Sequence, residues 1–507
     1  MKMKKIVYFL ILLLAGVTIS SCSKDFLETK PTNAFKEADV LATTDNLMGA
    51  LHGIHKNMYR QYSQQSESGQ GGINITLEAM ADDVVWPHEG NGWFRTALRW
   101  TDHRNKSGGA PSYFYTFYYR ILGNANKILD VIDNAIGSDA NKKIIKGQAL
   151  LYRAHAYFGL VQVYGKRYDA ASAATDLGVP LITTFTLEPQ PRATVAAVYQ
   201  QIEADLTEGI ALLTGYNRGS DKTHLNAAIG EGLYARVALT KGEWANAKTH
   251  AINARTAFSG GRLMTDVEYL DGFNDITNPE WIWGSRVVDD QTLFFYAFHA
   301  YMSYNFNSTN IRQAPKVINN LLYDKISATD VRKGLWIPAP VRGSATATPP
   351  VIANPDVPTT YSLFPYMNVK YAVKNSGSSV ADIPYMRLAE MYLIQAEAEA
   401  RLGETANAQT TLFDLVKTRD AGYVKSTATG QALVDEIMIQ RRVELWGEGM
   451  RWLDLKRLNL PLDRRGANMN ATLYIRMEVA AGDIDWQFHF PKVEEDSNPF
   501  ILENPNP

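Results

Sequence analysis

Two distant stretches of the 507-residue chain share one pattern of small residues. Residues 235–247 read ARVALTKGEWANA, and residues 396–408 read AEAEARLGETANA. Small side chains let two helices approach closely, and the shared glycines, Gly242 and Gly403, suit the turn between them. The pattern therefore predicts two similar helical hairpins, with two unrelated amphipathic hairpins as the alternative.

Helical spacing of apolar residues extends beyond these stretches. Residues 121–163 are predicted to form two helices joined at Gly137 and Ser138, and residues 194–213 and 225–240 form a second predicted pair. The helix-Gly-x-x-x-Ala-helix pattern resembles the tetratricopeptide repeat, whose paired helices stack into a superhelix. A strict period of about 34 residues is absent, so the resemblance implies an irregular array.

One predicted helix carries an expected surface ion pair. After residue 385, apolar residues recur at helical spacing, and Glu397 precedes Arg401 by four positions. An acidic and a basic residue at this spacing stabilise an exposed helix face. We therefore expect this pair to lie on the solvent side.

The other segments lack a helical period and are expected to be loops with a few short strands. The predicted scaffold covers about 32–60, 119–258 and 381–457. The predicted loop-rich regions are 61–118 and 259–380, with short strands at 281–283 and 366–373 and a Pro/Ala/Thr-rich segment at 342–360. Because these regions interrupt the helices, we expect one mainly α domain over residues 22–507 with a loop-rich ligand-binding face.

The first 22 residues have the layout of a processed leader. Three lysines precede an apolar run over residues 6–19 that is too short to span a bilayer comfortably. The run ends in Ile-Ser-Ser-Cys, which resembles the lipobox of bacterial lipoproteins, where the cysteine is acylated with fatty acids such as palmitate. Cys22 is the only cysteine in the chain. We expect a signal peptide over residues 1–21 and lipidation of Cys22, with an ordinary signal peptide as the alternative.

The rest of the chain shows no run of about 18 apolar residues, so we expect no transmembrane helix. Residues 23–25, Ser-Lys-Asp, resemble part of the surface-export signal of Bacteroidetes lipoproteins. The expected location is therefore the outer membrane, lipid-anchored and facing the cell exterior.

The two ends of the mature chain resemble one family. Residues 440–457, QRRVELWGEGMRWLDLKR, are similar to the C-terminal signature of the SusD/RagB family of outer-membrane lipoproteins. Residues 22–31, CSKDFLETKP, resemble the start of those mature chains. The closing segment of the family usually reads Pro-Ile-Pro, from which His489-Phe490-Pro491 departs.

The resemblance implies a tetratricopeptide-like superhelix that supports a loop-rich face. It also implies capture of glycans and their delivery to a TonB-dependent SusC-like transporter, that is, nutrient uptake within polysaccharide utilisation. The RagB branch implies peptide as the alternative ligand.

Charge and motifs exclude several other functions. The 51 basic and 53 acidic residues leave no clustered positive surplus for nucleic acid. No P-loop, Gly-x-Ser-x-Gly or His-Glu-x-x-His motif occurs, and nine scattered histidines indicate no metal site. We expect no cofactor and no catalysis.

Two pairs of carboxylates are candidates for catalytic residues. Asp82 and Asp83 beside Trp86 resemble a glycosidase pair in composition, but adjacent residues rarely converge on one bond, so a surface glycosidase is the least favoured hypothesis. Glu444 and Glu448 would share a helix face among arginines, where we expect mutual neutralisation and predict that Arg441→Ala destabilises the fold.

Aromatic residues gather in two loop regions, residues 86–100 and 281–304. Sugar rings present an apolar C–H face to flat aromatic side chains, and their hydroxyl groups bind Asn or Arg side chains. We favour packing for Trp281 and Trp283. The motif match to the family is poor here, and the predicted ligand-binding residues are Trp86, Asn91, Trp93, Arg95, Tyr296 and Tyr301.

Overall fold

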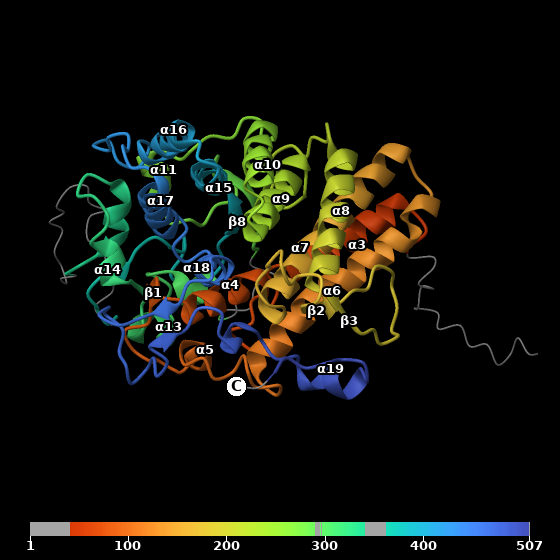
Figure 1. The fold of residues 1–507 in the computed structure, drawn as a ribbon, viewed down its shortest axis with the longest axis horizontal. Helices are drawn as coiled ribbons and strands as arrows, with labels where there is room; N and C mark the ends of the chain where they lie inside the picture. Colours follow the sequence, from red (N-terminus) through yellow and green to blue (C-terminus); the bar gives the residue numbers. More distant parts are fainter. Residues whose placement is uncertain (1–40, 289–294, 296, 340–360, 506–507) are drawn as a thin grey trace, which may run out of the picture.

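Paired helices stack side by side across the molecule (Figure 1). The computed structural model describes residues 41–288, 295, 297–339 and 361–505. The array begins with α3 (Thr44–Asn57), α6 (Gly109–Val131), α7 (Asp139–Tyr164) and α8 (Val195–Leu213). It continues through α9 (Ala227–Lys241), α10 (Trp244–Ala257), α15 (Leu388–Arg401), α16 (Thr405–Val416) and α17 (Gly430–Glu444). The predicted mainly α array is confirmed. The leader, Cys22, Tyr296 and the Pro-rich segment lie outside the described ranges.

Local sequence starts and ends the helices where expected. The side chains of Ser138, Thr194 and Asn226 each accept a backbone N–H bond three positions on and so cap α7, α8 and α9. The two hairpins of the repeat, α9–α10 and α15–α16, turn at Gly242 (φ +76°) and Gly403 (φ +78°). Glycine adopts this left-handed conformation without steric cost, so the shared residue forms the same turn twice.

The expected surface ion pair of α15 is buried instead. Glu397 has no exposed surface, and its carboxylate binds the Arg457 guanidinium, with its Oε2 2.7 Å from Nη2. Arg401 Nη2 lies 3.7 Å from the same carboxylate. The prediction of a solvent-facing pair is wrong because α15 packs against α10, α16 and α17 and has little face left for water.

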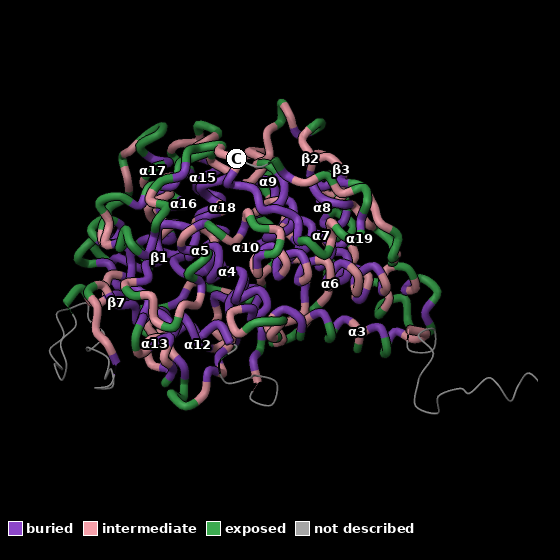
Figure 2. Tube along the Cα trace, turned by 90° about the horizontal axis from the view of Figure 1, so that it is seen from below, coloured by how far each residue is buried: buried purple, intermediate pink, exposed green. Residues whose placement is uncertain are grey.

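Residues 61–118, predicted to be loops, contain a central helix. All twelve residues of α4 (Gly69–Met80) are buried (Figure 2). A helix covered on every side shows no amphipathic period, which is why the prediction missed it. Its glycines permit close packing, since a Cβ on Gly71 would lie 3.0 Å from Phe298 Cβ and one on Gly72 would lie 2.5 Å from the Ser66 carbonyl oxygen.

Short strands and helices fill the segments between the long helices. The longest strands, β4 (Trp281–Ser285) and β8 (Ile383–Arg387), pair antiparallel and confirm the strand predicted at 281–283. A four-stranded sheet has the order β1 (Val84–Val85), β5 (Val317–Ile318), β7 (Met367–Asn368), β6 (Trp336–Ile337). Only Met367–Asn368 of the strand predicted at 366–373 forms.

The remaining strand pairs are β2 (Leu177–Pro180) with β3 (Arg192–Thr194) and β9 (Leu462–Asp463) with β10 (Glu478–Val479). The short helices are α5 (Arg95–Leu98), α11 (Asp266–Tyr269), α12 (His299–Met302), α13 (Thr309–Gln313), α14 (Asn320–Tyr323), α18 (Arg451–Arg457) and α19 (Lys492–Ser497). Among the described residues, 3-10 turns cover Ile132–Asn134, Val331–Leu335 and Ile484–Trp486. Within the described ranges, no helix is long and apolar enough to cross a bilayer.

The end of the chain returns to the first helices. Residues 486–505, here called the C-terminal clasp, hydrogen-bond to the end of α7: Phe488 N–H donates to the Val163 carbonyl at 2.9 Å, and the Asn504 side chain donates to the Tyr164 carbonyl at 2.7 Å. Arg192 holds the Leu502 carbonyl at 2.8 Å. The clasp therefore closes the helical array with residues from the far end of the sequence.

Candidate functional site

The predicted ligand loop follows β1 and rests on a buried aromatic base. The base consists of Trp86, Phe94 and Tyr301, and the Phe94 and Tyr301 rings meet edge to face at 5.1 Å. Trp86 is 2% exposed and Tyr301 is 1% exposed, so neither ring has a free face in this structure. Trp86 N–H also donates to Tyr474 Oη at 2.7 Å. These two predicted residues hold the loop in place here.

Three predicted residues remain accessible above this base. Asn91 is exposed, Trp93 is half-buried, and the Arg95 guanidinium is 47% exposed beside Glu89 at 2.7 Å. Gly90 and Gly92 both have positive φ and turn the loop outward. The structure thus brings an amide, an indole and a guanidinium into one short exposed loop.

Lys316 supports this loop and was not predicted. Its Nζ lies 5.0 Å from the Trp86 ring centroid and donates to the Ala314 carbonyl at 2.8 Å. Burial lowers the pKa of Lys316 to about 7. The residue follows Pro315 in a stretch without periodicity, so no sequence signal marked it.

Asp82 and Asp83 are bound by arginines. Arg451 Nε lies 2.7 Å from Asp82, and Arg442 Nη2 lies 2.5 Å from Asp83. Burial would raise the pKa of Asp82, but Arg451 and Arg442 outweigh burial and lower it to about 2; burial still raises the pKa of Asp83. Both carboxylates are buried and occupied, an arrangement that a glycosidase acid and nucleophile do not have.

A larger set of matched charges lies in the core, here called the buried charge layer. Its members are Glu280, Asp330, Arg332, Lys370, Arg387, Arg419, Glu444 and Glu448. Arg387 contacts Glu280 at 2.6 Å, Glu444 at 2.8 Å and Glu448 at 2.7 Å. Burial would raise the pKa of Glu444, but Arg419, Arg387 and Arg332 hold it well below its usual value. Glu444 and Glu448 are neutralised as predicted, but by cations from elsewhere in the chain, because Arg441 binds Asp454 and Arg451 binds Asp82.

Glu444 and Glu448 do not share a helix face, contrary to the prediction. Helix α17 ends at Glu444, and α18 begins at Arg451. Gly447 (φ +80°) and Gly449 (φ +85°) form the turn between them. The two carboxylates meet Arg387 from a bend, because positive φ at these glycines ends the helix.

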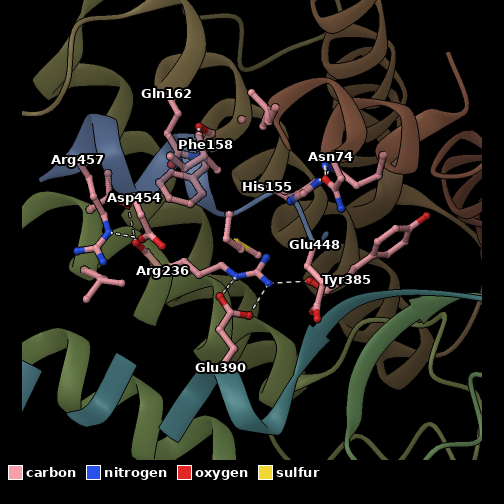
Figure 3. Close-up of a pocket in the computed structure, with 18 of the residues that line it drawn as sticks. Asn74, His155, Phe158, Gln162, Arg236, Tyr385, Glu390, Glu448, Asp454 and Arg457 are labelled. Atoms are coloured by element: carbon pink, nitrogen blue, oxygen red, sulfur yellow. Dashed lines mark hydrogen bonds and ion pairs between the residues drawn. The ribbon is translucent and has the colours of Figure 1, made fainter. Parts of the chain in front are cut away.

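A narrow internal cavity of about 80 Å³ adjoins this layer (Figure 3). Its walls come from both halves of the chain, and its charges are paired: Arg236 binds Glu390 at 2.6 Å, and Arg457 binds Asp454 at 2.8 Å. Ligand pockets generally measure about 300–1,000 Å³, so this cavity has room for a few waters and not for a sugar.

No described group of three or more His, Cys, Asp or Glu side chains has the geometry to hold a metal ion. The features that point outward are loops on a helical scaffold. Stacked helical hairpins with exposed loop insertions define a tetratricopeptide-like scaffold protein.

Comparison with known proteins identifies the family. Residues 25–239 match a family described as starch-binding and associating with the outer membrane, and residues 259–500 match the SusD family. The two matches lie in succession along the chain, which belongs to the SusD family. Members of this family are known as binding proteins rather than enzymes.

Individual relatives agree with this assignment. SusD-like protein P2 of Formosa agariphila is 24% identical over 92% of this chain and 93% of its own length. A SusD-like carbohydrate-binding protein of Bacteroides vulgatus superposes with a TM-score of 0.77 at 25% identity, covering 91% of this chain and 98% of its own. A SusD superfamily protein of Bacteroides thetaiotaomicron, 22% identical, shares the fold with a TM-score of 0.77 over 92% of this chain and all of its own. The tetratricopeptide-like fold is thereby confirmed.

Proposed function

We propose that this protein is a non-catalytic cell-surface lipoprotein that captures oligosaccharides and passes them to a TonB-dependent SusC-like transporter. The observation that carries the proposal is the exposed Asn91–Trp93–Arg95 loop on its buried aromatic base. An indole face receives the apolar side of a sugar ring, while an amide and a guanidinium bind hydroxyl groups. A rigid base keeps these groups preorganised, which reduces the entropy lost on binding.

Two further features complete the proposal. Residues 22–507 act as one unit tethered through lipidated Cys22 on the outer face of the outer membrane. Tyr296 lies beyond the described residues and stays a predicted ligand contact. Replacing Cys22 with Ser should release the protein from membranes, and retention there would contradict the anchor.

Affinity electrophoresis of the 23–507 chain against a panel of neutral and acidic polysaccharides tests the function. Retardation by at least one glycan, without cleavage products, is the expected result. Absence of retardation together with saturable binding of peptides would assign the chain to the peptide-importing alternative. Turnover of a glycan that is lost in an Asp82→Asn variant would instead show a glycosidase.

A further inference from the structure

A second opening, lined by none of the residues of the predicted ligand loop, holds three histidines. This cleft has a volume of about 570 Å³ and is bounded by the end of α3, the loop between α8 and α9, and the end of β4. We call it the histidine cleft. The residues used below are His52, His55, Lys56, Asp221, His224 and Arg286.

The three imidazole rings contact one another. The His55 and His224 ring centroids lie 4.6 Å apart, those of His52 and His224 lie 5.1 Å apart, and those of His52 and His55 lie 6.0 Å apart. His52 and His55 come from one helix, whereas His224 comes from the loop before α9. The fold thus brings the rings together from two elements.

Two buried ring nitrogens in the cluster have unused hydrogen-bonding capacity. His55 Nδ1 bonds with Tyr152 Oη, but His55 Nε2 and His224 Nδ1 have no partner among the described residues. A buried polar atom without a hydrogen-bonding partner destabilises the fold, so such atoms are rare in folded proteins. Both side chains line the cleft, and a rotation of either ring toward it would bring the unpaired nitrogen within reach of a ligand.

The charge around the rings favours a negative ligand. Lys56 and Arg286 are exposed at the cleft, and Arg218 packs behind His224, to whose carbonyl it donates at 2.6 Å. Among the described lining residues, Asp221 is the one carboxylate, and its Oδ1 already accepts the Thr223 N–H at 3.0 Å and hydroxyl at 2.7 Å.

A metal ion fits this geometry less well than an anion. Metal ligation requires ring nitrogens that converge on one point, and no described histidine or carboxylate group does so. An anion needs only donors around it, which protonated imidazoles, lysine and arginine provide.

We propose that the histidine cleft binds the anionic group, a carboxylate or a sulfate ester, of an acidic sugar residue. This inference rests on the proposed function, since it names the class of glycan that the protein selects. Tyr59 also lines the cleft and borders the space that the sugar ring would occupy.

Binding of an anion in this cleft should be coupled to proton uptake by the histidines. Burial lowers the pKa of His55 well below its usual value, and positive charge on His224 or His52 would lower it further. The negative charge of Asp221 acts in the opposite direction and raises it. Burial also lowers the pKa of His224, with Asp221 opposing and His52 and Arg218 adding to the effect. The empty cleft is therefore neutral at these rings, and a bound anion would raise both pKa values. Affinity for an acidic sugar should increase as pH falls.

Calorimetric titration of the 23–507 chain tests the inference with oligogalacturonate and its fully methyl-esterified form. A sulfated galactan oligosaccharide and its desulfated form distinguish sulfate from carboxylate. We expect the acidic form to bind about tenfold more tightly at about pH 5.5 than at about pH 7.5, with no such change for the neutral form. Equal binding of acidic and neutral forms at both pH values would overturn the inference.

Matched variants locate the effect. His224→Gln should remove the pH dependence, whereas His250→Gln should keep it, because His250 stacks on Tyr234 outside the cleft. A His224→Gln variant with unchanged pH dependence contradicts the inference, as does Zn²⁺ binding that displaces the acidic sugar.

An NMR titration of the imidazoles with D-galacturonate separates this inference from the proposed function. A rise in the pKa of His55 and His224 supports the cleft even if no polysaccharide binds. Unchanged pKa values overturn the cleft even if neutral glycans are captured elsewhere.

Discussion

The buried charge layer and the histidine cleft treat polar groups in opposite ways. In the layer, every member has a bonded partner, and Arg387 alone contacts three carboxylates. In the cleft, two ring nitrogens have no partner within the described part of the chain, and exposed cations stand nearby. Side chains whose polar atoms are all paired hold the scaffold together. Side chains with unpaired polar atoms beside an opening are the ones that we propose bind a ligand.

Removing the centre of the layer should have the largest effect. Arg387→Met leaves Glu280, Glu444 and Glu448 short of a buried partner, and we expect a loss of about 3–5 kcal/mol in the free energy of unfolding. Urea denaturation measures it. Arg441→Ala, which removes one of the two arginines that bind buried Asp454, should also destabilise the fold.

The matched control is Arg465→Met, since Arg465 is exposed and pairs with Asp463 and Glu478. Its loss should stay below about 1 kcal/mol. Similar losses for Arg387 and Arg465 would break the distinction between buried and exposed charge.

Glu78 combines features of both regions, because it is a buried carboxyl group at the edge of the layer with one oxygen that lacks a hydrogen-bonding partner among the described residues. Its Oε1 accepts the Gly449 N–H at 2.7 Å, whereas Oε2 has no partner among the described residues. Burial, aided by Asp83, raises its pKa from 4.5 to about 8. The stabilisation from its bound proton is present below pH 4.5 and is lost as pH rises through 8.

Glu78→Gln should therefore stabilise the protein at pH 8 by on the order of 4 kcal/mol and change little at pH 4. Denaturation at the two pH values measures the difference. An equal effect at the two pH values would mean that the pKa of Glu78 is not raised and that Glu78 is ionised in the native state at pH 8. Glu188→Gln, at an exposed position, is the control.

On the exposed face, Trp93→Ala should lower affinity for the captured glycan about tenfold, or about 1.4 kcal/mol, through loss of stacking. Affinity electrophoresis reports the change. Trp244→Ala removes another half-buried indole, on α10, and should leave affinity intact. Unchanged binding by Trp93→Ala would refute the site while leaving glycan capture standing.

The smallest effect is expected for the stability of Arg95→Ala. The Arg95–Glu89 pair is exposed, and such pairs contribute less than about 1 kcal/mol. Thermal unfolding should hardly change, while glycan affinity falls. A large loss of stability would place Arg95 among the scaffold residues instead.

The sequence was sufficient for features encoded locally. Glycine turns and apolar spacing predicted the hairpins because each depends on residues within a few positions. Helix α4 escaped because a helix buried on all sides has no periodic pattern. Glu397 was misplaced because its partner, Arg457, lies sixty positions away.

The candidate sites were predicted less completely for a related reason. Aromatic type does not reveal exposure, so Trp86 and Tyr301 were named with Trp93 although their rings are covered. The histidine cleft was missed because His224 joins His52 and His55 only through packing of α3 against the α8–α9 loop. Prediction of the candidate sites was therefore limited by long-range packing and not by the chemistry of the residues.

The C-terminal clasp also imposes an order on biosynthesis. Within the described residues, the carbonyl groups of Val163 and Tyr164 accept hydrogen bonds from Phe488 and Asn504 of the clasp. At translation rates of about 5–20 residues per second, the roughly 300 intervening residues take about 15–60 s to make. During that delay the first helices lack their final cover. A nascent chain that cannot form the clasp early stays incompletely folded, and an incompletely folded chain suits the export route proposed for this protein.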